Sequence, residues 1–153
     1  MVHPSGAPSP MEEHEREQVQ LCEEAVARLA DALPGREVAC LLPSDDILRH
    51  VAHRGSLRLI YEVPRELGGI VWRAVEQRRI QVVHDVAADP DYIASDDSIR
   101  SEVVAPVTVA DLVVAVLDVE SPTPFADGDP ELVEREAAWL AAEFEPLLGK
   151  STQ

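Results

Sequence analysis

Three acidic residues could act together at one end of a predicted sheet. Asp118 and Glu120 lie two positions apart in the apolar segment 112–121, and Glu102 opens the apolar segment 102–109. Side chains alternate between the two faces of a strand, so Asp118 and Glu120 should share a face. The same face should carry the aliphatic residues Leu112, Val114 and Val116. The pattern predicts carboxylates at the end of an apolar stripe.

Several interpretations remain open for these carboxylates, because grouped acids repel one another unless a positive charge neutralises them. They can bind a small ligand that carries a cationic group, since charge-assisted hydrogen bonds would offset their desolvation. They can instead be solvated, or be paired with Arg73 or Arg100. They could also serve as acid or base groups in an enzyme. The sequence leaves catalysis open and favours a binding protein.

Other residues suited to chemistry give weaker patterns. His50 and His53 are three positions apart, and this odd spacing should send them to opposite faces of a strand. His84 stands beside Asp85, a combination typical of a hydrogen-bonded structural histidine. The spacing of Cys and His residues fits no zinc site. We therefore expect no metal site, and the sequence identifies no cofactor.

Length, charge and hydropathy restrict the class of protein. The chain has 153 residues, which suits one domain, and its formal net charge is −16. So negative a molecule is not expected to bind nucleic acid or an anionic membrane surface, and no apolar run is long enough to span a bilayer. Residues 1–10 lack the apolar region of a secretion signal, so we expect a cytoplasmic protein. Cys22 and Cys40 are expected to be buried apolar residues rather than a disulfide.

Hydrophobic periodicity predicts an α+β domain over 12–149, with tails at 1–11 and 150–153. The elements that we expect, in chain order, are a helix over 12–33, strands over 37–42 and 47–53, a third short strand over 57–63, a helix over 68–78, a strand over 80–83, a polar loop over 84–100, a strand pair over 102–109 and 112–121, and a last helix from about 129. This order lacks the regular alternation of a parallel α/β fold. It favours an antiparallel sheet with the terminal helices on one face.

Several blocks of sequence, spaced along most of the chain, resemble the GAF domain, a sensory module. The blocks are Gly69-Ile70-Val71-Trp72-Arg73-Ala74-Val75-Glu76, Val83-His84-Asp85-Val86, Asp89-Pro90-Asp91-Tyr92, Ser101-Glu102-Val103-Val104-Ala105-Pro106-Val107 and Val114-Ala115-Val116-Leu117-Asp118-Val119-Glu120-Ser121. The resemblance implies a small-molecule pocket on the sheet face opposite the terminal helices, covered by the short helix and the long loop. Family members bind varied ligands, so the family implies the fold better than the ligand.

The resemblance also gives candidate ligand-binding residues. These are Tyr61, Trp72, Asp85, Tyr92, Ile93, Ser95, Ser101, Glu102, Asp118 and Glu120. Trp72 and Tyr92 would form pocket walls, although Trp72 could equally be a core residue.

One branch of the family is enzymatic, and this chain resembles it in part. The free methionine-(R)-sulfoxide reductases share the Ser101-Glu102 and Leu117-Asp118-Val119-Glu120-Ser121 signatures. Their chemistry needs a thiolate and further cysteines to resolve the oxidised thiol. The corresponding cysteine positions are occupied here by Tyr61, Val71 and Ser95. We therefore expect no reductase activity.

The function that the sequence favours is a stand-alone sensory module that binds a small ligand and acts through its own dimer or a partner protein. The alternatives are an enzyme that uses the pocket carboxylates and a structural dimer with a vestigial pocket. Apolar residues recur at steps of three and four in both terminal helices, as Val19, Cys22, Val26, Leu29 and Leu33, and as Val133, Ala137, Leu140, Phe144 and Leu147. These two apolar seams predict a homodimer through the terminal helices.

Overall fold

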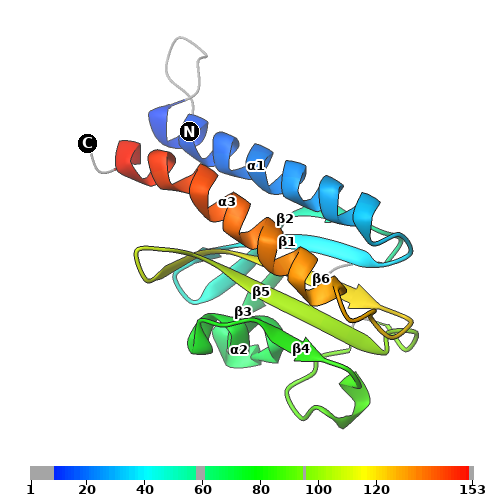
Figure 1. The fold of residues 1–153 in the computed structure, drawn as a ribbon. Coiled ribbons are helices and arrows are strands. Elements are labelled where there is room, and N and C mark those ends of the chain that lie inside the picture. Colours follow the sequence, from blue (N-terminus) through cyan, green and yellow to red (C-terminus); the bar gives the residue numbers. More distant parts are fainter. Residues whose placement is uncertain (1–8, 58–60, 95, 152–153) are drawn as a thin grey trace.

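The computed structural model describes residues 9–57, 61–94 and 96–151, and it shows an antiparallel sheet with helices on both faces (Figure 1). The strands are β1 (Glu37–Ser44), β2 (Ile47–Arg54), β3 (Glu62–Pro64), β4 (Gln81–Val83), β5 (Ser101–Val109) and β6 (Leu112–Ser121). Their order across the sheet is β3-β2-β1-β6-β5-β4. The predicted α+β class is confirmed. No helix in the described ranges is long and apolar enough to cross a membrane.

Two long helices lie side by side on one face of the sheet, and a short helix lies on the other (Figure 1). The long helices are α1 (Pro10–Ala32) and α3 (Asp129–Ser151), and the short helix is α2 (Gly69–Gln77). Single-turn helices cover Arg65–Leu67 and Val86–Ala88. Helix α1 begins at Pro10, two residues before the predicted start, because Ser9 and Glu12 form a reciprocal capping box and Pro suits the first helical position.

The helix face of the sheet holds a closed apolar core. Leu29 of α1 and Leu140 and Phe144 of α3 are each at most 2% exposed, and they pack with alternate residues of β1, β5 and β6. The apolar seams of the terminal helices are therefore buried within the protomer's own core. Cys22 and Cys40 lie in this core as free thiols, and burial raises the pKa of Cys40 well above its usual value.

The opposite face, which we call the pocket face, holds a second apolar cluster. It joins Ile70 and Trp72 of α2 to Leu41, Val104 and Val116 of the central strands. The two clusters use alternate residues of the same strands, as strand geometry requires. The pocket face thus has its own packed base, on which the candidate site is built.

Register shifts interrupt the alternation in two of the described strand pairs. Val107 pairs with Ala115 but Thr108 pairs with Val113, so Val114 is an extra residue in β6. Val114 consequently packs against the helix-face core and Val113 against the pocket-face cluster. Our expectation that Val114 shares the face of Asp118 was wrong, because simple alternation ignores such a bulge.

Candidate functional site

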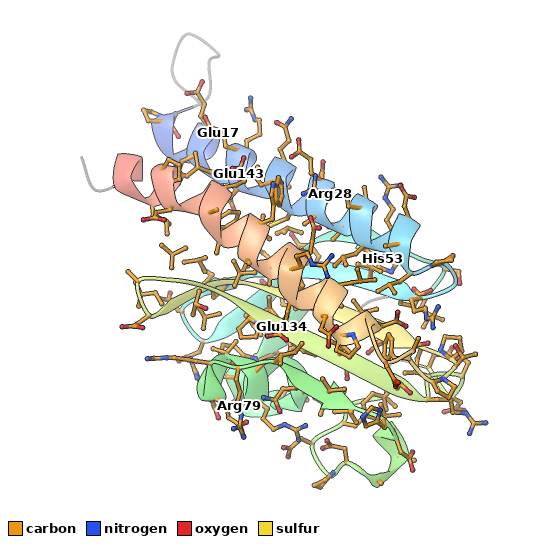
Figure 2. The ribbon with its side chains drawn as sticks, in the orientation of Figure 1. Glu17, Arg28, His53, Arg79, Glu134 and Glu143 are labelled. Atoms are coloured by element: carbon orange, nitrogen blue, oxygen red, sulfur yellow. The ribbon has the colours of Figure 1, made fainter. Side chains whose placement is uncertain are left out.

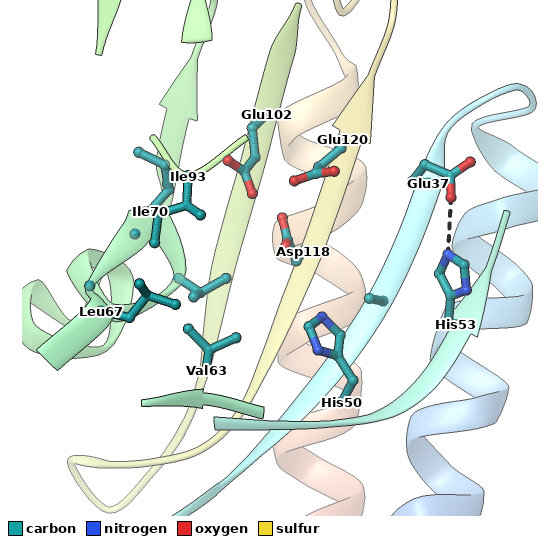
Figure 3. A pocket seen from close by; sticks show the side chains of 14 residues that line it. Glu37, His50, His53, Val63, Leu67, Ile70, Ile93, Glu102, Asp118 and Glu120 are labelled. Atoms are coloured by element: carbon teal, nitrogen blue, oxygen red, sulfur yellow. Dashed lines mark hydrogen bonds and ion pairs between the residues drawn. The ribbon is translucent and has the colours of Figure 1, made fainter. Parts of the chain in front are cut away.

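A cavity of about 70 Å³ lies on the pocket face, among β1, β2, β6, the start of α2 and the loop before β5 (Figure 3). Its lining residues are Glu37, Ala39, His50, His53, Val63, Leu67, Gly68, Gly69, Ile70, Val71, Ile93, Glu102, Asp118 and Glu120. Aliphatic side chains of α2 and the loop form one wall, and carboxyl groups and imidazoles form the other. This division suits a ligand with an apolar part and a polar part.

Strand pairing brings the carboxyl groups together. Glu102 on β5 pairs directly with Glu120 on β6, and Glu120 pairs on its other side with Glu37 on β1. Asp118 lies two residues before Glu120 on the same face of β6. Glu102, Asp118 and Glu120, which we call the carboxyl trio, offer oxygen atoms that all lie within 4.8 Å of one another. Each residue of the trio is at most 9% exposed, so the grouping predicted from sequence is present and buried.

The electrostatics of the trio indicate a shared proton. Burial, followed by the charge of Asp118, raises the pKa of Glu102 well above its usual value. Burial also raises the pKa of Asp118, while a hydrogen bond from Glu102 and the nearby His50 act in the opposite direction. Two carboxyl groups can hydrogen-bond to each other only when one carries a proton. The raised pKa of Glu102 favours a proton on this carboxyl group.

Arg73 does not pair with the trio, as one interpretation of the sequence allowed. Its guanidinium donates to Asp89 at 2.8 and 2.9 Å, to Asp91 at 3.1 Å and to Gln81 at 2.9 Å. These bonds lower the pKa of Asp89 and connect α2 to the long loop before β5. Ile93 of that loop lines the cavity. Arg73 thus connects α2 to the loop.

Two histidines that we expected on opposite faces of β2 both line the cavity (Figure 3). His53 pairs with Ala39 and His50 pairs with Leu41, with a register shift between Cys40 and Leu41. This bulge adds one residue between the histidines, so their spacing of three returns both to the pocket face. The expectation that His50 and His53 lie on opposite faces was wrong, because the bulge arises from the pairing of β1 with β2 and cannot be predicted from the spacing of the histidines.

Glu37 also lines the pocket, although its sequence context does not predict this. Its carboxylate accepts hydrogen bonds from the backbone amides of Ser56 and Leu57, both at 3.0 Å, and lies 3.0 Å from His53 Nε2. These contacts fix the carboxylate beside the segment that follows β2. The signal that could have found Glu37 is its place opposite Glu120, which only the β1–β6 register reveals.

The glycines before α2 also line the cavity. Gly68 has φ 78° and Gly69 has φ 93°, a region that favours glycine. A Cβ atom on Gly69 would lie 3.1 Å from Ile93 Cδ1. Glycine at position 69 therefore lets the start of α2 approach the loop closely. The positive φ angles of Gly68 and Gly69 form the turn that precedes the helix.

Four residues predicted from sequence line the cavity: Ile93, Glu102, Asp118 and Glu120. Trp72 is 2% exposed and donates its indole N–H to the carbonyl of Val63 at 2.8 Å. Tyr92 packs against the pocket-face cluster, and Tyr61 is 63% exposed beside α1 in a separate groove.

The remaining predicted residues have local backbone contacts or are not described. Asp85 accepts a hydrogen bond from the amide of Ala87 at 3.1 Å, and the Ser101 hydroxyl donates to the carbonyl of His84 at 2.9 Å. Ser95 lies outside the described residues. The structure therefore brings together the acids and Ile93, and places the aromatic candidates elsewhere.

Comparisons with solved structures agree with this architecture. The free methionine-R-sulfoxide reductase of Staphylococcus aureus, in complex with substrate, is 25% identical with a TM-score of 0.70, and the match covers 94% of this chain and 98% of that one. The substrate complex of the Neisseria meningitidis reductase is 24% identical with a TM-score of 0.76, covering 92% and 90% of the two chains. The type II reductase of Thermoplasma acidophilum is 23% identical with a TM-score of 0.76, covering 88% and 96%.

The comparison with curated proteins returned no match. The sequence model of one family matches residues 17–144, which include every strand and α2. The antiparallel sheet, the helix arrangement and the pocket face all fit that family. The chain belongs to the GAF domain family.

Proposed function

We propose that the protein is a sensory or regulatory module that binds a small ligand with a cationic group in the pocket-face cavity. One observation carries the proposal: the buried carboxyl trio lines a cavity whose other wall is aliphatic. An ammonium or guanidinium group would donate charge-assisted hydrogen bonds to the trio. The aliphatic wall would take the apolar part of the same molecule.

The size of the cavity restricts the ligand. Pockets for drug-sized ligands usually have volumes of about 300–1,000 Å³. The cavity here is about 70 Å³, which suits a compact ligand of a few heavy atoms and not a haem or a nucleotide. We therefore favour a small aliphatic amine or guanidine.

The location of the cysteines supports the expectation that the protein is not a sulfoxide reductase. Val71 lines the cavity and Tyr61 lies outside it, so neither brings a thiol to the pocket. Cys22 and Cys40 are fully buried in the core on the other face of the sheet. A thiol-dependent turnover assay on free methionine sulfoxide should give no activity. Turnover that disappears in Cys22→Ser or Cys40→Ser would contradict this.

A second candidate function is catalysis by the carboxyl groups themselves. The proton that Glu102 shares with Asp118 favours it, because a raised pKa lets a carboxyl group donate a proton near neutral pH. The structural relatives named above are reductases, which leaves an enzyme consistent with the fold. Chemical change of a bound ligand during NMR titration would support catalysis over binding.

Signal output is proposed to pass through a homodimer or a partner protein. The apolar seams of α1 and α3 are buried within the protomer, so a dimer would have to use the outer faces of these helices, where Glu17 and Glu143 lie (Figure 2). Such acidic faces repel each other less as salt screens them. Sedimentation should therefore show association that increases with salt, and a monomer at every salt concentration would refute the dimer.

A matched set of probes tests ligand binding. We would titrate n-butylammonium, 1-butanol and butyrate, which have four carbon atoms each and differ in charge, into ¹⁵N-labelled protein. The ammonium compound should shift the amide resonances of Gly69 and Ile93 at the lowest concentration. Glu102→Gln and Asp118→Asn should abolish the preference, and the exposed control Glu131→Gln should retain it. Equal or stronger binding of butyrate would overturn the proposal.

A further inference from the structure

The carboxyl trio has a geometry that fits a single metal ion. One oxygen from each of Glu102, Asp118 and Glu120 lies within 4.8 Å of the other two. Calcium binds oxygen at about 2.4 Å, so two oxygens on opposite sides of the ion are about 4.8 Å apart. Three oxygens at this spacing lie no more than about 2.8 Å from a common centre, so small side-chain movements would let one ion contact all three. Figure 3 shows these carboxyl groups turned toward one another from the neighbouring strands β5 and β6.

A second observation points to a missing ligand at the same place. Asp118 is 9% exposed, and its Oδ1 atom is buried without a hydrogen bond from any residue that the structure describes. A buried carboxylate oxygen without a donor is unfavourable, because it has lost water and gained no replacement. Asp118 lines the cavity between Glu102 and Glu120 (Figure 3). An ion at the centre of the trio would satisfy this oxygen.

Charge and donor type define the class of ion. A divalent cation would neutralise much of the negative charge of three carboxylates, which lose their protons when they bind a metal ion. All three side chains offer oxygen, the donor that Mg²⁺, Ca²⁺ and Mn²⁺ prefer over softer ligands. His50 and His53 line the cavity but are not part of the trio. The donor set therefore favours a hard ion over zinc or copper.

We infer that Glu102, Asp118 and Glu120 form a binding site for a hard divalent cation, and that this ion competes with the cationic group of the small ligand. The inference rests on the proposed function only in using the same carboxyl groups. Binding of the ion needs no organic ligand. Competition follows because both cations would occupy the space between the same oxygens.

Manganese provides a direct probe, because free Mn²⁺ gives an electron paramagnetic resonance signal that is lost on binding. Titration of Mn²⁺ into the whole chain at physiological ionic strength should show one saturable site, and Ca²⁺ or Mg²⁺ should displace the ion. Asp118→Asn should weaken this site about tenfold or more, as loss of even an outer ligand partner does in metal sites. Glu131→Gln removes the same charge from an exposed position and should leave the site unchanged. Thermal unfolding of each variant verifies that it is folded, and Glu102→Gln supplies a second test of the site.

The outcomes separate this inference from the proposed function. No saturable Mn²⁺ site, or a site that both trio variants retain, would overturn the inference. Butylammonium binding without Mn²⁺ binding would reject the metal ion and leave the proposed ligand standing. Mn²⁺ binding that requires the trio, without butylammonium binding, would support the ion and reject the proposed ligand. Binding of both without competition would contradict a common site.

Discussion

The two faces of the sheet differ in what their buried residues do. On the helix face, residues such as Val103 and Val119 join a closed apolar core with α1 and α3. On the pocket face, Glu102 and Asp118 alternate with them along the same strands and line a cavity. Side chains alternate between the two faces of a strand. One face of the sheet therefore carries residues that stabilise the fold, and the other carries residues of the candidate binding site. Burying acidic residues on one face is unfavourable for folding, and the apolar side chains buried on the other face offset this loss of stability.

The largest expected effect tests the helix face. Phe144→Ala should reduce the free energy of unfolding by about 3–5 kcal/mol, because Phe144 is fully buried and its removal leaves a cavity. Ile93→Ala on the partly exposed loop should have a much smaller effect. Urea denaturation measures both. A loss at Ile93 as large as the loss at Phe144 would contradict the division between the faces.

A second prediction concerns the loop that covers the pocket face. Arg73→Gln should reduce the free energy of unfolding by about 1–3 kcal/mol, since charged hydrogen bonds to partly buried Asp89 are lost. It should also accelerate amide hydrogen exchange around Ile93. Arg79→Gln, which changes an exposed arginine of the neighbouring turn, is the control. Unchanged exchange at Ile93 in Arg73→Gln would show that other contacts hold the loop.

The third prediction concerns pH. The pKa of Glu102 is raised well above 4.5 in the folded protein, so above pH 4.5 the folded state binds more protons at this group than the unfolded state does. The contribution of Glu102 to stability is therefore complete at low pH and falls as pH rises through the raised pKa. Glu102→Gln should remove this fall and stabilise the protein by on the order of 1 kcal/mol at about pH 8. Unfolding curves across pH that coincide for both proteins would contradict a buried, proton-sharing Glu102.

The smallest expected effect is on the outer surface of the helices. Arg28 contacts Glu136 at 2.6 Å and stacks on Trp139, but its side chain is 47% exposed. Solvent screening limits such a pair to less than about 1 kcal/mol, so Glu136→Gln should hardly change the unfolding midpoint. A larger change would mean that the interface between α1 and α3 depends on charge rather than on its apolar seam.

The fold could be predicted from the sequence because its determinants are local. Hydrophobic periodicity located the long helices and the β5–β6 pair, and the alternation of Asp118 and Glu120 placed both acids on one face. The carboxyl trio followed from that alternation together with the position of Glu102 at a strand start.

The rest of the site depends on contacts that are distant in sequence. His50 and His53 reach the cavity only through the bulge in β2, and Glu37 becomes a pocket residue through its register with Glu120. Trp72 was a candidate wall because aromatic residues are rare here, yet its indole N–H binds the carbonyl of Val63 within the packed cluster. Register and tertiary packing therefore decide which candidates face the cavity.

The most direct test is the ¹H–¹⁵N spectrum of the double variant Glu102→Gln/Asp118→Asn, recorded with and without n-butylammonium. One spectrum reports on both faces, since resonance dispersion reports the fold and shifts at Gly69 and Ile93 report the site. We predict a dispersed spectrum like that of the unchanged protein, with no shifts on addition of the ammonium compound. A collapsed spectrum would show that the acids are needed for folding, and retained shifts would show that they do not bind the ligand. Either result would contradict the separation of fold and site.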